Sequence, residues 1–278
     1  MKIFAHHAHV FPNNVHPKDP EIPPPASSLS DLCRLVEECD IDRVVAFAPF
    51  PEFYQGVEFH PNRWLSNEIR NYPSLEGFGT IDFEKKNTEE QVEEIKKLGL
   101  KGIKLHPAVQ KFSILSPKAF RVYETAQDLT LPISFHTGVH WYPIKETHPL
   151  LFDIVAHRFP RLKFSMEHVG GYHFFKDAVA VIMNNFQGGD KRLNSNIYAG
   201  IVSVLEQTPE ANFWYLGREK VKELINLVGD SFLIFGLDFP YRTKTEIKED
   251  IRIIKHMDTL DSSKEKILGK NLEKFLIP

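Results

Sequence analysis

Residues 131–138, LPISFHTG, hold the pattern that decides the fold of this chain: a short apolar run that ends in a histidine. Short apolar runs of this length predict buried β-strands, and this pattern recurs along the whole sequence. Eight runs qualify, and four of them end in histidine. The predicted strands are Lys2–His6, Arg43–Ala48, Leu75–Ile81, Lys101–His106, Leu131–His136, Leu162–His168, Asn196–Ile201 and Phe232–Gly236.

Amphipathic helices fill the intervals, because the predicted strands recur roughly every 35 residues, which leaves room for one crossover helix each. The segment Asn87–Leu98 is the clearest: its glutamates come early, its lysines come late, and Thr88 with Gln91 forms a predicted capping box. Other helices are predicted near 29–39, 64–72, 148–158, 172–185 and 217–228, from Ser116-Pro117, around Ile247–Ile254, and from Ser262, where Glu265 would complete a second capping box.

Alternating strands and helices imply a parallel sheet, and eight such units predict a closed α/β barrel of the (β/α)₈ TIM type. An open, doubly wound sheet is the rival, but it calls for a glycine-rich turn after the first strand, where this chain has His6-His7-Ala8-His9. The proline-rich pieces His16–Pro25 and Pro49–Pro61 are interpreted as loops over one barrel mouth. We therefore expect residues 1–278 to form a single domain.

Composition narrows the functional class. The 34 basic and 37 acidic residues give a net charge of −3, which argues against a nucleic-acid partner or an anionic membrane surface. No apolar run approaches the roughly 20 residues of a membrane helix, and the first residues lack a signal-peptide pattern. Cys33 and Cys39 are too few for a disulfide framework. A soluble, reduced, cytoplasmic protein is expected.

The histidines are the chemical signal, because catalytic groups of a parallel barrel lie at the carboxyl ends of its strands. Strand ends that are far apart in sequence meet around one mouth, so side chains placed there converge on one small volume. The residues that end or follow a predicted strand are His7, His9, His106, His136, His168 and Asp238.

His7 and His9 are two positions apart on a strand and therefore share a face, which leaves His6 pointing outward. With His136 and Asp238 they would offer three imidazoles and one carboxylate to a single divalent ion, most simply zinc, with water at an open position. Each residue has a plainer alternative: an exposed strand end for the first pair, a satisfied core histidine for His136, and a helix cap for Asp238. The set of four favours one metal site.

Several short motifs occur in a fixed order along the chain. They are His7-Ala-His9 with Val10-Phe11, Gly99-Leu-Lys-Gly-Ile-Lys-Leu-His-Pro107, Phe135-His-Thr-Gly138, Glu167-His-Val-Gly-Gly171, Gly236-Leu-Asp-Phe-Pro-Tyr241 and Ile267-Leu-Gly-Lys-Asn271. In this order the chain resembles the amidohydrolase-related group of the metal-dependent amidohydrolase superfamily, in the branch that contains aminocarboxymuconate-semialdehyde decarboxylase.

The resemblance implies a (β/α)₈ barrel, a possible homodimer, and metal positions at His7, His9, His136 and Asp238. It also implies that His168 lies close to the metal and contacts the substrate or the reacting water. One departure stands out: the family has an acidic residue two positions before the first histidine, and this chain has Ala5. That change would alter the hydrogen bonds around the metal without removing a ligand.

Other residues are candidates for binding a carboxylate-bearing substrate. Lys104 and His106 lie two apart on one strand, so both are expected to face the mouth. Lys104 would bind a carboxylate or polarise a carbonyl, or alternatively form an ion pair with Asp238 or Glu167; in distant relatives a lysine on this strand is carboxylated and bridges two metals. Further substrate-binding candidates are Arg63, Tyr142 and Arg242, and an apolar lid is predicted from Phe50, Phe53, Tyr54 and Phe59.

Three functions follow from this site. The first is a metal-dependent hydrolase of a small amide, ester or lactone, because a divalent cation lowers the pKa of bound water from about 15.7 toward 7. Asp238 would be the general base, and Lys104 or His168 would stabilise the oxyanion. The second is a non-oxidative decarboxylase of a small unsaturated or aromatic acid, in which His168 or Asp238 protonates carbon. The third is a catalytically silent, metal-binding barrel.

Overall fold

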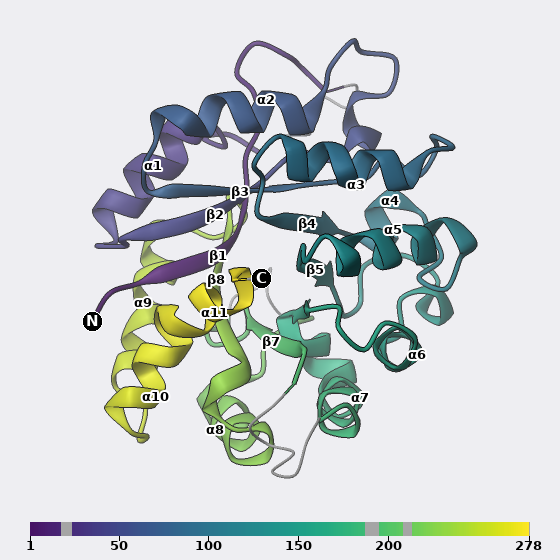
Figure 1. Cartoon of the computed structure of the whole chain (residues 1–278). Helices are drawn as coiled ribbons and strands as arrows, with labels where there is room; N and C mark the ends of the chain where they lie inside the picture. The colour runs from purple at the N-terminus through teal and green to yellow at the C-terminus, as the bar shows by residue number, and fades with distance from the viewer. Residues whose placement is uncertain (18–23, 187–194, 208–212, 278) are drawn as a thin grey trace.

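The computed structural model describes residues 1–17, 24–186, 195–207 and 213–277, so most of the proline-rich segment His16–Pro25 lies outside it. Its strands close into a parallel barrel in which neighbours follow chain order from β1 to β8 (Figure 1). The predicted (β/α)₈ fold is therefore confirmed. The strands are β1 (Phe4–His9), β2 (Arg43–Phe47), β3 (Leu75–Gly79), β4 (Gly102–Leu105), β5 (Ile133–His136), β6 (Phe164–Glu167), β7 (Ile197–Ile201) and β8 (Leu233–Phe239).

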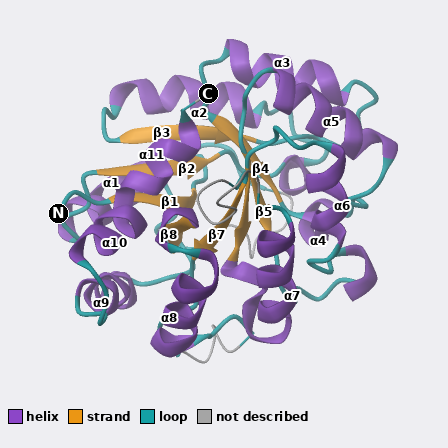
Figure 2. Cartoon of the chain, turned by 60° about the horizontal axis from the view of Figure 1, so that its bottom comes forward, coloured by secondary structure: helices purple, strands orange, loops and turns teal. Residues whose placement is uncertain are grey.

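Helices surround the strands on the outside of the barrel (Figure 2). The longer ones are α1 (Leu29–Glu38), α2 (Pro61–Glu68), α3 (Thr88–Lys97), α5 (Pro117–Asp128), α6 (Leu151–Arg158), α7 (Gly171–Asn184), α8 (Gly217–Val228) and α9 (Lys244–Lys255). Short helical turns are η1 (Pro51–Tyr54), η2 (Ile69–Asn71), α4 (Pro107–Gln110), η3 (Ile144–Glu146), η4 (His168–Gly170), η6 (Asp230–Phe232), α10 (Asp261–Glu265), η7 (Lys266–Lys270) and α11 (Asn271–Leu276). None of the described helices is both long enough and apolar enough to span a membrane.

Helix starts agree with the sequence in part. Ser116 caps α5 as predicted, since its hydroxyl accepts a hydrogen bond from the Ala119 amide at 3.2 Å. The capping box predicted for Thr88 and Gln91 is wrong, because α3 begins at Thr88 and the Gln91 side chain instead bonds both backbone groups of Asp82.

The capping box predicted for Ser262 and Glu265 is wrong as well. Helix α10 begins at Asp261 after Leu260, whose apolar side chain cannot cap, and no side-chain cap bond is present there. A serine caps a helix from the position just before its first turn. Ser262 lies inside the first turn of α10, so its hydroxyl is not placed to cap the helix.

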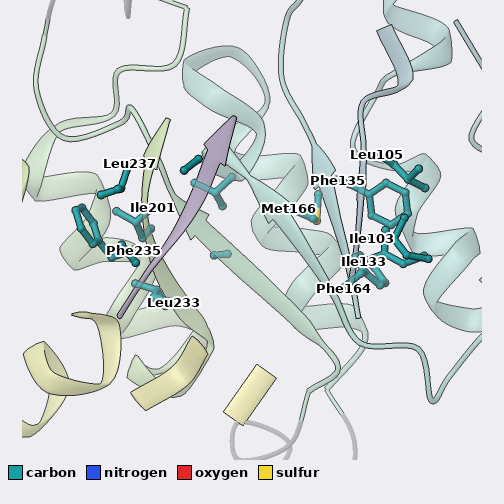
Figure 3. Packing of buried hydrophobic residues seen from close by; sticks show 14 of the residues in the cluster. Ile103, Leu105, Ile133, Phe135, Phe164, Met166, Ile201, Leu233, Phe235 and Leu237 are labelled. Atoms are coloured by element: carbon teal, nitrogen blue, oxygen red, sulfur yellow. The ribbon is translucent and has the colours of Figure 1, made fainter. Parts of the chain in front are cut away.

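Alternation along β5 separates the two layers of the barrel. Phe135 points outward and contacts Tyr123 and Phe152 on the covering helices, with ring centroids 5.6 and 4.8 Å away. Figure 3 shows this outer layer of packed side chains on several strands. Ser134 and His136 take the opposite face of the strand and point into the barrel. The interior of the barrel therefore carries the polar groups of this strand.

An apolar cluster fills part of the barrel interior. Phe47, Phe78 and Tyr198 form it together with Phe275 of α11, whose ring lies 4.9 Å from that of Tyr198. In Figure 1, α11 lies near the centre of the ring of strands. The C-terminal helix thus closes one end of the barrel, and the polar side chains gather toward the other end.

Strand β1 departs from regular geometry at its histidines. His7 has φ 61°, and the pairing register with β2 shifts between Ala5 and Ala8. Both His6 and His7 consequently turn into the barrel, so the prediction that His6 points outward is wrong. His6 is fully buried, and its ring contacts those of Phe47 and Phe78.

The bounds of the first and last strands also differ from the sequence prediction. Strand β1 continues to His9 instead of ending at His6, and β8 continues to Phe239 instead of ending at Gly236. Asp238 therefore lies within the last strand and not after it. The following helix begins with Thr243 as its cap, which excludes Asp238 as the cap of α9.

Candidate metal centre and active site

Side chains from three strand ends meet at the open end of the barrel. His7, His168 and Asp238 each offer one ligand atom, and these atoms all lie within 4.8 Å of one another. Nε2 of His7 is 3.3 Å from Oδ1 of Asp238 and 3.2 Å from Nε2 of His9. The predicted convergence of residues 7, 9 and 238 on one small volume is thus present in the structure, and His168 joins it.

His136 lies beside this cluster. Its ring stacks on that of His106, with centroids 3.8 Å apart and planes 8° apart, and its centroid is 4.8 Å from that of His168. Nε2 of His136 is buried and has no hydrogen-bond partner among the described residues. A buried ring nitrogen without a partner is costly unless it binds something, so this atom is suited to a ligand role.

The backbone is strained where the cluster forms. His7, His168 and Asp238 have φ values of 61°, 60° and 56°, in the left-handed region that side chains other than glycine rarely adopt. Each such residue costs about 1–3 kcal/mol and persists only where the surrounding structure holds it. Three strained residues at one point indicate that the barrel is built to aim these side chains.

Burial keeps the imidazoles of the site neutral. Desolvation, reinforced by the positive charge of Lys104, holds the pKa values of His7 and His9 well below the usual range. Desolvation likewise lowers the pKa values of His136 and His168. A neutral imidazole keeps the lone pair that a metal ion needs. Together with the carboxylate of Asp238, these donors fit a divalent cation.

Glu167 of β6 orients His7. Its buried carboxylate accepts hydrogen bonds from His7 Nδ1 and from Ser134 Oγ, both at 3.0 Å, and lies 3.3 Å from His6 Nδ1. Burial raises the pKa of Glu167, but His6 and His7 outweigh it and hold that pKa well below its usual range. Because the carboxylate accepts, the proton of His7 resides on Nδ1 and Nε2 is left for a metal. Gly200 makes room, since a Cβ there would meet Oε2 at 2.5 Å.

Two further hydrogen bonds fix the orientations of His168 and Asp238. Nδ1 of His168 lies 2.8 Å from the carbonyl oxygen of Val202 and must donate to it, which leaves Nε2 as an acceptor. Oδ2 of Asp238 accepts from the hydroxyl of Ser203 at 2.7 Å. Both side chains are therefore held from the segment that follows β7.

A cavity of about 340 Å³ opens above the cluster. Trp214 stacks on His168 in its wall, with ring centroids 5.2 Å apart. No lysine or arginine occurs among the described lining residues, so the walls suit a flat, largely apolar molecule. The lining residues are His7, His9, Phe50, Phe53, His106, Val109, His136, His140, Trp141, His168, Trp214, Asp238 and Tyr241.

Lys104 lies away from this cavity. Its side chain is fully buried, does not line the cavity, and has its Nζ atom 5.1 Å from the centre of the Phe47 ring. Within the described part of the chain Nζ has no hydrogen-bond partner, so the predicted ion pair with Asp238 or Glu167 is not formed by contact. Burial lowers the pKa of Lys104 to about 8, against the pull of those two carboxylates.

The predicted substrate-binding residues divide. His106 lines the cavity, whereas Arg63, Tyr142 and Arg242 are not among its described lining residues. Arg63 pairs with Glu94 of α3 at 2.6 Å. Arg242 is buried against Asp250 and Glu206, at 3.2 and 3.3 Å. These acidic partners hold both guanidinium groups away from the catalytic cavity. Of the predicted lid, Phe50 and Phe53 line this cavity, while Tyr54 and Phe59 line a different one.

Sequence reasoning missed three contributors. Trp214 follows β7 at a distance that no strand-end pattern marks. Ser203 also follows β7 and has no histidine or acidic neighbour to single it out. Glu167 was visible in the motif Glu167-His-Val-Gly-Gly171, but its bond to a histidine 160 positions away could not be foreseen from spacing.

Comparisons with known proteins agree with this geometry. The amidohydrolase family model matches residues 4–276. The 2-amino-3-carboxymuconate-6-semialdehyde decarboxylase of Dictyostelium discoideum is 24% identical over 216 residues, which cover 68% of this chain but only 58% of that protein.

Solved structures share the fold. An uncharacterised TIM-barrel protein from Bordetella bronchiseptica is 18% identical with a TM-score of 0.78, and 5-carboxyvanillate decarboxylase from Sphingomonas paucimobilis is 13% identical with a TM-score of 0.74. Both alignments cover 99% of this chain and 98% of the other. The chain therefore belongs to the amidohydrolase family, in the aminocarboxymuconate-semialdehyde decarboxylase-like branch, whose members are metal-dependent hydrolases or decarboxylases.

Proposed function

We propose that this protein is a metal-dependent, non-oxidative decarboxylase of a small, planar, unsaturated or aromatic acid. One observation carries the proposal: the cluster of His7, His168 and Asp238 forms the base of a cavity with aromatic walls and, among its described lining residues, no lysine or arginine. The decarboxylases to which the chain is similar support the same reaction.

The ion-binding residues would be His7, His9, His136 and Asp238, with His168 adjoining them. A bound divalent cation supplies Lewis acidity, which polarises a substrate oxygen and withdraws charge from the reacting carbon. We assign zinc, because neutral imidazoles with one carboxylate are its usual donors in catalytic sites. Glu167 holds His7 in the tautomer that leaves Nε2 to face the ion.

The cavity itself favours loss of a carboxylate. Trp214 and Phe50 offer flat faces for a conjugated ring, and the histidines around them are neutral. A carboxylate in such a poorly solvated place loses its hydration, whereas neutral carbon dioxide has little hydration to lose. Binding a planar acid here therefore raises the free energy of its charged group relative to the products.

Proton delivery is assigned to Asp238. The carboxylate first takes a proton from solvent; the carbon–carbon bond then breaks, carbon dioxide leaves, and the electron pair that remains on the ring or alkene carbon takes that proton, which leaves the carboxylate ionised again. Nδ1 of His168 is committed to the carbonyl oxygen of Val202, and burial lowers the pKa of His168, so its Nε2 stays an acceptor that faces the cluster. Ser203 fixes the carboxyl group by donating to Oδ2.

Hydrolysis of an amide, ester or lactone is the second candidate. The observation in its favour is that Asp238 is partly exposed, at 13%, and borders the cavity, so it can take a proton from water as a general base. The two reactions leave different products from the same site. A hydrolase opens a ring or cleaves an acyl bond without loss of carbon.

The test is a product assay with zinc-loaded enzyme. The substrates would be 5-carboxyvanillate, aminocarboxymuconate semialdehyde and a carboxylated pyrone lactone, with carbon dioxide release and ring opening measured in parallel. We expect carbon dioxide from at least one acid, and loss of that signal in Asp238→Asn. Ring opening without carbon dioxide would replace decarboxylation by hydrolysis, and no turnover with stoichiometric metal would overturn both.

A further inference from the structure

A second cavity, of about 390 Å³, lies at the same end of the barrel as the catalytic one. Its walls come from η1 and the residues after it, the start of α2, the segment after β3, and α3. The turn η1 stands between the two cavities: Phe50 and Phe53 line the catalytic one, whereas Glu52 and Tyr54 line the second. Residues of the single segment 50–54 thus line two different cavities.

Two oxygen atoms in this second cavity have no partner. Tyr54 is 3% exposed, and its hydroxyl makes no hydrogen bond to any residue that the structure describes. Oε2 of Glu52 is likewise buried and unpaired. A buried polar group without a hydrogen bond costs free energy, so native proteins keep few of them unless the site has a use for them. Both groups come from η1 and both line the same pocket.

The other acidic and basic side chains named below have partners within the cavity lining. Arg63 pairs with Glu94 at 2.6 Å, and Lys85 pairs with Asp82 at 3.4 Å. Glu84 accepts a hydrogen bond from Gln55 at 2.9 Å. Among the described lining residues, Glu52 is therefore the acidic group that has neither a counterion nor a hydrogen-bond donor on Oε2.

We propose that the second cavity is a binding site for a small organic cation, a protonated primary amine whose ammonium group bonds Glu52 and Tyr54. An ammonium group carries three donors and no acceptor, which matches two unpaired oxygens that both accept. The adjacent rings of Tyr54 and Phe59, with centroids 4.5 Å apart, offer an apolar surface for the carbon chain.

Other ligand classes fit less well. An anion would find no free arginine or lysine among the described lining residues. A metal ion would need several donors together, and across the described chain three such ligand atoms gather only at His7, His168 and Asp238. The acidic character of the unpaired Glu52 side chain therefore favours a cation with hydrogen-bond donors. This site is independent of which reaction the catalytic centre performs.

Titration calorimetry with n-butylammonium on the metal-loaded enzyme tests the site. We expect saturable binding to the wild type, weakened at least about tenfold in Glu52→Gln, because a hydrogen bond to a charged group is lost. Tyr54→Phe should weaken it less, and Glu58→Gln, on the exposed stretch outside the cavity, is the matched control and should not change it. Sodium butyrate and 1-butanol serve as anionic and neutral probes of the same length.

The pH dependence adds a second readout. Burial raises the pKa of Glu52 to about 8, and Asp82 and Glu84 add to the rise. As pH rises toward that value, affinity for butylammonium should therefore increase by up to about tenfold per pH unit, and binding should release a proton. In Glu52→Gln the affinity should not change with pH. The other titratable or charged side chains around the cavity are His60, Arg63, Asp82, Glu84, Lys85 and Glu94.

Three results would overturn the proposal. They are no saturable binding of butylammonium to the wild type, equal binding to Glu52→Gln, and butyrate or butanol binding as tightly as the cation. Because Gln has the shape of a protonated glutamic acid, the variant is expected to fold. Its circular dichroism and metal content, both matched to the wild type, would show that a loss of binding is local.

Discussion

Replacing Glu167 by glutamine should weaken both the barrel and its metal site. The substitution keeps the shape of the side chain but removes its negative charge and turns one accepting oxygen into a donor. Oε1 accepts hydrogen bonds from Ser134 and Ser165, and Oε2 accepts one from His7. Whichever way the glutamine amide turns, either the two serines or His7 would face an NH₂ group instead of an accepting oxygen. Lys104 also loses the first of the two carboxylates that favour its charged form.

The expected magnitude follows from burial. Glu167 is 0% exposed, and removing one member of a buried charged network costs about 3–5 kcal/mol of unfolding free energy. The loss of a carboxylate that orients a ligating histidine lowers metal affinity by about 10–100-fold. The two effects are separable, because unfolding can be measured on metal-free protein and affinity on folded protein.

Urea unfolding of the metal-free variant and zinc titration against a competing chelator measure these two quantities. Glu76→Gln is the matched control: it also changes a strand glutamate, but one that is 24% exposed and paired with Arg43, so it should cost less than about 1 kcal/mol and leave zinc affinity unchanged. If Glu167→Gln binds zinc as tightly as the wild type, Glu167 does not orient His7 for the metal. If its free energy of unfolding equals that of the wild type, the buried network of Glu167 does not stabilise the barrel.

His6→Ala should cost about 3 kcal/mol of unfolding free energy, because a fully buried ring among aromatic neighbours is lost; a urea midpoint equal to that of the wild type would contradict its inward position. His7→Ala and His136→Ala should each strip the metal and abolish turnover while far-ultraviolet circular dichroism stays that of a folded barrel, and stoichiometric metal by elemental analysis in either variant would remove that residue from the ligand set. Glu52→Gln should become more stable than the wild type as pH rises: the folded wild type binds the Glu52 proton more tightly than the unfolded chain does, so its stability falls between pH 4.5 and about 8. The free energies of unfolding of the variant and the wild type would be measured in amine-free buffer at both ends of this pH range. If the variant loses stability relative to the wild type as pH rises, the unpaired carboxyl group is excluded.

Local patterns were sufficient for the architecture and for much of the site. A run such as Leu131–His136 predicts a strand because its length and apolar character are properties of neighbouring residues. Eight such runs alternating with helices predict a parallel barrel, and a parallel barrel brings every strand end to one mouth. The grouping of His7, His9 and Asp238 followed from these rules alone.

Contacts between distant strands required the folded barrel. His6 was expected outside because regular alternation was assumed, but the left-handed backbone at His7 turns both histidines inward. Glu167 reaches His7 only because β6 and β1 face each other across the closed barrel, and the same closure buries Lys104 completely. Periodicity describes which way a side chain points from its own strand. Which partner it meets depends on register, closure and local strain, and these are set by all the strands together.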